Sequence, residues 1–250
     1  MKITRTAHGL RLSQHGVVIS ELRTSSGPTH SVFDVLAALI GLLAPTGRVG
    51  LLGFAGGGMM APLSALAPAR RIDSVDLDLE AYHLFRRHCP RWRGSVQWTH
   101  SDAAVWLQAQ PRDFALLVED LSIPKDGDVV KPEISWTVMP QLIRRRLNRD
   151  GVGVFNLLPP TGTAGGREIR QIAAHFPSAR VIDFREFQNR ILVVGKALPS
   201  ARTLGSGLRE SLHMLHSRQA GRVRLRQVPS SGEKLPTHAR PSAQSSTPRR

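Results

Sequence analysis

The stretch Val49-Gly50-Leu51-Leu52-Gly53-Phe54-Ala55-Gly56-Gly57-Gly58 decides the fold of this chain. It is a short apolar run that leads into a glycine-rich turn, and the residues that follow, Met59 to Leu66, are compatible with a helix. A second apolar run then ends in Val75-Asp76-Leu77-Asp78. A strand, a glycine turn, a helix and a second strand ending in an acid form the unit with which an open parallel sheet binds a nucleotide-like ligand.

The same alternation of apolar runs and segments of helical spacing continues downstream. The last two apolar runs, 179–184 and 190–194, are separated by only five residues, which is too short for a crossover, so they must pair antiparallel. The sequence therefore predicts an α/β fold with a Rossmann-like, doubly wound sheet that is mostly parallel and ends in a C-terminal antiparallel hairpin. This is the layout of class I S-adenosylmethionine-dependent transferases. The other expected strands are 48–52, 72–77, 96–99, 114–118 and 151–157.

The residues before the sheet form a small extension. Alternating apolar runs within 9–22 flank the turn residues Gln14-His15-Gly16, which predicts an N-terminal β-hairpin. A helix then begins after Ser31, a plausible N-cap. We expect three parts, namely an extension over 1–30, a Rossmann-like domain over 31–198 that binds S-adenosylmethionine, and a basic tail over 199–250.

The tail carries half of the charge excess. The net charge is +15, and residues 199–250 hold ten Lys/Arg against Glu210 and Glu233, a balance of +8. Few large apolar residues follow Leu215, so we expect this part to be largely disordered, with one short helix over 208–216. A weak, nonspecific and salt-sensitive contact with nucleic acid is the partner that such a tail suggests.

Several classes of protein are disfavoured. No apolar run reaches the roughly 18 residues of a membrane span, and the N-terminus Met-Lys-Ile-Thr-Arg does not lead into a signal segment, so we expect a cytoplasmic protein with no membrane partner. Cys89 is the only cysteine, which excludes an internal disulfide and gives no cluster of metal ligands.

Three features favour an adenosyl sulfonium ligand over a nicotinamide dinucleotide. The turn reads Gly53-x-x-Gly56-Gly57-Gly58 rather than G-x-G-x-x-G, Asp102 follows the third strand where a carboxylate would read an adenine amino group, and the sheet ends in a hairpin. Asp76 would accept the ribose hydroxyls with either ligand. The glycines can also serve only a tight turn, and Asp102 can also be the N-cap of the next helix.

With these motifs in place, residues 48–158 resemble the spermidine synthase family. The matching segments are the glycine turn, Val75-Asp76-Leu77-Asp78, Asp102-Ala103 and Asp120-Leu121-Ser122-Ile123-Pro124. The resemblance implies a transferase, of the methyl- or aminopropyl-transfer type, and suggests a homodimer without a metal. Its ligand would be S-adenosylmethionine or decarboxylated S-adenosylmethionine as a substrate.

The resemblance also implies roles for single residues. The turn glycines Gly53, Gly56 and Gly57 would take the amino-acid portion of the ligand, and Asp76 its ribose. Leu77 would cover one adenine face, while Asp102 and Ala103 would meet the adenine edge. Asp120 falls where the family keeps its catalytic base, a carboxylate that takes the proton of an attacking amine.

The amine side of that family does not carry over. Gly56 and Ile123 stand where the family has acids, and Phe33-Asp34 aligns with its Tyr-His/Gln pair. Because a dicationic polyamine needs a carboxylate for each ammonium, we do not expect putrescine as the acceptor.

Three hypotheses remain open from the sequence. The chain is a transferase with another small-molecule acceptor, a non-catalytic binding or regulatory protein that keeps the fold, or a methyltransferase acting on a nucleic acid or another acceptor. Glu119 is either buried structure or a group that orients Asp120. Phe33 and Trp136 are either walls of the acceptor site or ordinary core residues.

Overall fold

The computed structural model describes residues 1–158 and 165–228. Its centre is an eight-stranded sheet with the order β13-β11-β12-β10-β7-β4-β5-β6. The strands are β4 (Val49–Leu52), β5 (Ile72–Asp76), β6 (Val96–His100), β7 (Phe114–Glu119), β10 (Leu147–Leu157), β11 (Ser178–Phe184), β12 (Arg190–Gly195) and β13 (Val223–Gln227).

The pairing follows the predicted topology. Strands β10, β7, β4, β5 and β6 are parallel, and β12 and β11 then pair antiparallel at the other end. The chain order reverses between β4 and β7, which lie side by side. In open α/β sheets, ligands bind outside the carboxyl ends of the strands at such a reversal. The predicted fold class is confirmed.

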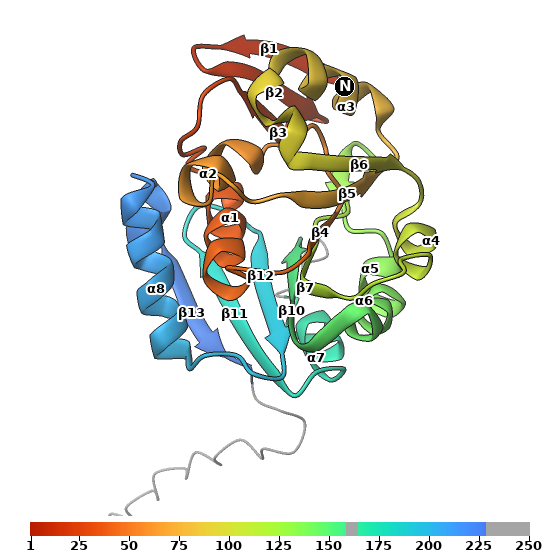
Figure 1. The fold of residues 1–250 in the computed structure, drawn as a ribbon, viewed down its shortest axis with the longest axis vertical. Coiled ribbons are helices and arrows are strands. Elements are labelled where there is room, and N and C mark those ends of the chain that lie inside the picture. The colour runs from red at the N-terminus through yellow and green to blue at the C-terminus, as the bar shows by residue number, and fades with distance from the viewer. Residues whose placement is uncertain (159–164, 229–250) are drawn as a thin grey trace, which may run out of the picture.

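Helices cover both faces of the sheet (Figure 1). On one face α1 (Val32–Leu43) packs against α2 (Met60–Leu66) and α8 (Ala201–Met214) over one apolar cluster. A second cluster on the other face joins α4 (Ala103–Gln108), α6 (Met139–Arg146) and α7 (Gly166–Ala173). The remaining helices are α3 (Leu79–His88), α5 (Ile134–Thr137), and the 3₁₀ turns η1 (Pro90–Ser95) and η2 (Arg218–Gly221).

The N-terminal extension is a three-stranded antiparallel sheet of β1 (Lys2–Thr6), β2 (Gly9–Gln14) and β3 (Val17–Arg23). The predicted hairpin is β2–β3, and β1 adds a strand that the sequence did not indicate because its residues are all exposed. Leu12 and Leu22 are fully buried beneath this sheet. A second unpredicted element is the hairpin of β8 (Ile123–Lys125) and β9 (Asp128–Val130), directly after β7.

The prediction of a largely disordered tail from residue 199 is wrong for residues 201–228. Helix α8 buries Leu204, Leu208 and Leu212, one residue on each turn, against the sheet and α1. Strand β13 then pairs with β11, and Arg226 forms an ion pair with Asp183. The prediction failed because it averaged charge over the whole segment and overlooked this apolar stripe, which orders the helix by burial. Residues 229–250 lie outside the described residues.

Among the described helices, each is too short or too polar to cross a bilayer.

Candidate functional site: two cavities that meet at Asp120

The site lies where the parallel strands end. Gly53 follows β4, and its φ of +91° is a conformation that glycine adopts without a steric penalty. A Cβ on Gly53 would lie 2.5 Å from the carbonyl oxygen of Asp120, which follows β7. The absence of a side chain at residue 53 therefore lets the ends of the two strands at the reversal approach each other closely.

The carboxylate of Asp76 holds the glycine turn in place. Its Oδ2 accepts hydrogen bonds from the amides of Phe54 (2.5 Å) and Ala55 (2.7 Å), and its Oδ1 accepts one from the amide of Asp78 (2.9 Å). A carboxylate has about four acceptor positions. One position therefore remains for a ligand hydroxyl without breaking the turn.

A first cavity of about 530 Å³ opens beside this turn. Five of the predicted ligand-binding residues line it, together with Asp120. Leu77 is 66% exposed although it is apolar, so its side chain presents an unpacked surface. Asp102 caps α4 by accepting the amides of Ala104 (2.8 Å) and Val105 (3.0 Å) through Oδ1, which leaves Oδ2 for a ligand. The five predicted residues are Gly53, Asp76, Leu77, Asp102 and Ala103.

The other two predicted glycines are not among the residues that line the first cavity. A Cβ on Gly56 would meet Leu12 at 3.0 Å and Leu22 at 3.1 Å, and one on Gly57 would meet Phe85 at 2.9 Å. Both glycines have positive φ. The absent side chain of Gly56 therefore lets the turn pack against the N-terminal sheet, and that of Gly57 lets it pack against α3. A ligand role for both glycines stays a prediction.

A second cavity of about 470 Å³ lies on the other side of Asp120. Its walls come from β3, the start of α1, β9, the end of β10, the β11–β12 loop and η2. Val17 and Val18 are 38% and 46% exposed and, with Phe33, give it an apolar wall. The residues that line both cavities are Ile19, Ala55, Asp120, Leu121 and Ser122.

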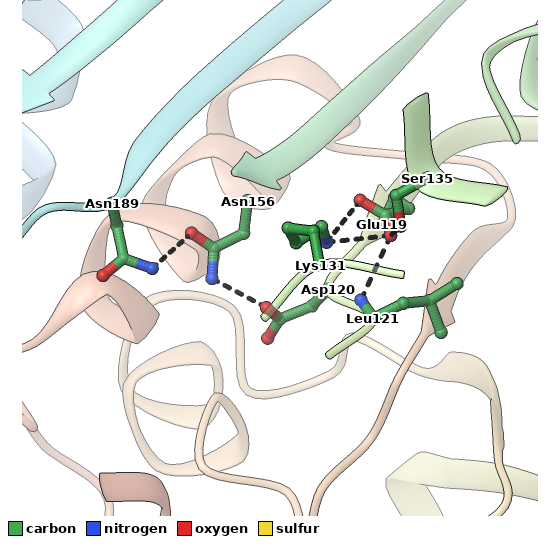
Figure 2. A network of polar contacts seen from close by, with 7 residues as sticks. All are labelled: Glu119, Asp120, Leu121, Lys131, Ser135, Asn156 and Asn189. Atoms are coloured by element: carbon green, nitrogen blue, oxygen red, sulfur yellow. Dashed lines mark hydrogen bonds and ion pairs between the residues drawn. The ribbon is translucent and has the colours of Figure 1, made fainter. Parts of the chain in front are cut away.

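Asp120 stands at the junction in a chain of amides (Figure 2). Asn156 donates from Nδ2 to Asp120 Oδ1 at 2.7 Å, and Asn189 donates to Asn156 Oδ1 at 3.0 Å. Burial raises the pKa of Asp120 from 3.8 to about 7, against the opposing effects of the Lys131 charge and the Asn156 hydrogen bond. A carboxyl with a pKa near neutrality is suited to accept and release a proton.

Glu119, the neighbour of Asp120, is a buried structural group. Lys131 donates to both of its oxygens at 2.9 and 2.7 Å, and Ser135 donates at 2.7 Å (Figure 2). Its Oε1 also accepts the amide of Leu121 at 3.2 Å. The Glu119–Lys131 ion pair connects the end of β7 to the residue that follows the β8–β9 hairpin. Glu119 therefore fixes the backbone that carries Asp120.

The remaining candidates separate clearly. Phe33 lines the second cavity, whereas Trp136 packs against the core cluster around α6 and α7. Asp34 is fully buried and accepts hydrogen bonds from Thr29 and from the amide of His30, so it shapes the loop before α1. Tyr82 of α3, the only tyrosine in the sequence, stacks on Trp98 of the edge strand β6, with ring centroids 4.0 Å apart.

Four groups at the site were missed from the sequence: Lys131, Asn156, Asn189 and Arg218. A weak indication of two of them is present in the sequence. Asn156 follows one apolar run and Asn189 precedes another, which places both at strand ends that face the site. Arg218 carried no such indication, since it lies in the segment that was predicted to be disordered.

The fold is similar to the folds of spermidine synthases and of methyltransferases. The chain superposes on a probable spermidine synthase from Corynebacterium glutamicum with a TM-score of 0.71 and 18% identity, over 96% of this chain and 95% of that one. Human methyltransferase-like protein 13, solved with SAH, superposes with a TM-score of 0.58 and 17% identity, over 75% of this chain and 92% of that one. Spermidine synthase from Thermotoga maritima superposes with a TM-score of 0.60 and 14% identity, over 77% of this chain and 67% of that one. No protein-family model matches the chain, and neither does the sequence of any curated protein.

Proposed function

We propose that the protein is a transferase that moves an alkyl group from S-adenosylmethionine, or its decarboxylated form, to a small acceptor that is not putrescine. The observation that carries this proposal is the position of Asp120. It lines both cavities, and its carboxyl has a pKa of about 7. A base between a donor site and an acceptor site is what such a transfer requires.

The first cavity suits the adenosyl part of the donor. Asp76 keeps one acceptor position for a ribose hydroxyl, Asp102 keeps Oδ2 for the adenine amino group, and Leu77 offers an apolar face. Two similar structures were solved with ligands of this type, human methyltransferase-like protein 13 with SAH and a spermidine synthase with the transition state analogue AdoDATO.

The second cavity then receives the acceptor. A sulfonium centre supplies a carbon that an acceptor lone pair attacks, and the electrons of the breaking C–S bond go to sulfur. Asp120 takes the proton that the acceptor atom loses, while Asn156 holds Oδ1 and fixes the direction of the carboxylate. Leu121 and Ser122 line both cavities and keep the two reactants adjacent.

A dicationic amine does not fit the charges of the second cavity. Two carboxylates besides Asp120 line it, and each already holds an arginine, as Glu21 pairs with Arg11 at 2.7 Å and Glu186 pairs with Arg222. Neither is available for a second ammonium without breaking an ion pair, so the amine would lose hydration without gaining a partner.

Mass spectrometry of purified protein with each donor and a panel of small acceptors tests the proposal. We expect an acceptor mass increased by a methyl or aminopropyl group, and no product when Asp120→Asn replaces the native protein. The proposal fails if the donors bind but no acceptor in any class is modified, which is the outcome of a binding protein that keeps the fold.

A further inference from the structure

The second cavity has an unbalanced positive charge at its rim. Arg218 and Arg222 stand near one carboxylate, that of Glu186. Arg222 and Gln219 donate to Glu186, whereas the guanidinium of Arg218 makes no ion pair or hydrogen bond within residues 1–158 and 165–228. Two arginines and one glutamate leave one positive charge without a matching negative charge.

Arg218 is held at this rim by buried neighbours on both sides. Ser217 caps η2 by accepting the amide of Gln219 at 3.2 Å. Gln219 is fully buried and donates to the carbonyl oxygen of His30 at 2.9 Å and to Glu186 at 3.3 Å. The amide of Arg218 itself donates to Nδ1 of His30 at 3.3 Å. The backbone of Arg218 is therefore fixed against the loop before α1, and both Arg218 and His30 line the second cavity.

His30 does not change the charge balance of the second cavity. Burial and the charge of Arg218 both lower the pKa of His30, which keeps the ring neutral near pH 7. Val17, Val18 and Phe33 give the cavity an apolar wall, and its charged lining residues Glu21, Lys131 and Glu186 are each already paired with a residue of opposite charge. The cavity thus combines one cation at its rim, an apolar body and a proton acceptor, Asp120, at its inner end.

We propose that the acceptor is an amphiphilic anion, with an apolar body against β3 and α1 and a carboxylate or similar oxyanion held by Arg218. This inference rests on the proposed function, because it assigns the substrate class of the same site. A guanidinium presents a planar fork of donors that matches a carboxylate.

The test uses two probes of similar shape and opposite charge, 3-phenylpropanoate and 3-phenylpropylammonium. Ligand-observed NMR titration on the full chain, with and without saturating methylthioadenosine, gives the affinity of each. We expect the carboxylate to bind more tightly than the ammonium, and Arg218→Gln to weaken the carboxylate about tenfold. Arg209→Gln on the exposed side of α8, which lines neither cavity, should leave binding unchanged.

A second variant removes the excess positive charge without changing Arg218. Arg222→Gln releases Glu186, which then neutralises Arg218, so the preference for the carboxylate should shrink or invert. The inference is overturned if the ammonium binds as tightly as the carboxylate, or if neither Arg218→Gln nor Arg222→Gln changes the ratio of the two affinities. Failure of methylthioadenosine to bind would instead contradict the proposed function, and the titrations without it keep the two failures distinct.

Discussion

The two cavities that meet at Asp120 are built in different ways. The first takes most of its walls from segments that follow the parallel strands β4, β5, β6 and β7, and the N-terminal sheet adds only Gln14 and Ile19. The second gathers its walls from the N-terminal sheet, the start of α1, the β11–β12 loop and η2, which are far apart in the chain. A site made from consecutive strand ends leaves a motif in the sequence, and one assembled from distant elements does not.

Asp120 belongs to both cavities, and its removal is expected to have the largest effect. Asp120→Asn keeps the shape of the side chain and an Oδ1 atom that accepts the hydrogen bond from Asn156. It removes the base, so turnover should fall by about 10²–10⁴-fold. Steady-state rates measure this, and Asp113→Asn, at an exposed carboxylate that lines neither cavity, is the matched control. Retention of more than about a tenth of the activity would rule out Asp120 as the base.

The buried Glu119–Lys131 pair anchors the wall between the cavities. Lys131→Met leaves the Glu119 charge buried without its partner, so the free energy of unfolding should fall by about 3–5 kcal/mol. Denaturant titration measures the loss. The double variant Glu119→Leu/Lys131→Met removes both charges and should recover much of the stability. An unchanged midpoint for Lys131→Met would show that the pair does not anchor this wall.

The second cavity depends on a C-terminal segment that the first does not use. Leu208→Ala in the buried face of α8 should cost about 2–5 kcal/mol. Arg209→Gln, one residue away and exposed, should change stability by about 0.5 kcal/mol or less. If both variants unfold at the same denaturant concentration, α8 is not part of the fold and the second cavity loses its rim.

The pH dependence of turnover sharpens the role of the amide chain. With a pKa of about 7, Asp120 gains its base form as pH rises, so kcat/KM should increase through neutrality. The Asn156 hydrogen bond lowers this pKa, and Asn156→Ala should therefore move the rise to higher pH by about one unit. A rise at the same or a lower pH would show that Asn156 does not tune the base.

The same carboxyl should also affect stability, with a smaller effect. Its pKa in the folded protein, about 7, lies above its ordinary value of 3.8. Its stabilising contribution is therefore complete below the unfolded pKa and is lost as pH rises through about 7. Thermal unfolding should thus show Asp120→Asn gaining stability relative to the native protein between pH 5 and pH 9. A constant difference across that range would contradict the raised pKa.

Most of the fold and half of the site could be predicted from the sequence. The glycine turn, Asp76, Asp102 and Asp120 mark strand ends, and parallel topology brings such ends together whatever the rest of the chain does. Asn156, Lys131 and Arg218 could not be predicted, because their roles depend on side-chain contacts between distant elements. Arg218 was further hidden by the charge of its segment, which masked the leucine stripe of α8.

The structure also changes how the glycine turn is interpreted. In the sequence, Gly56 stands where the spermidine synthase family has an acid. In the structure, a Cβ at residue 56 would meet Leu12 and Leu22. The turn and the N-terminal sheet are therefore fitted to each other by packing. Under the proposed function, the second cavity disfavours a dicationic amine because arginines already hold Glu21 and Glu186.

Isothermal titration calorimetry of the adenosyl compounds tests the central claim most directly. S-adenosylmethionine, its decarboxylated form and methylthioadenosine would be titrated into the native protein and into Asp76→Ala, with NAD as the negative control. We predict that at least one sulfur nucleoside binds, that NAD does not, and that Asp76→Ala weakens binding about tenfold or more because a hydrogen bond to a charged group is lost. Absence of binding by all three sulfur nucleosides would contradict the account.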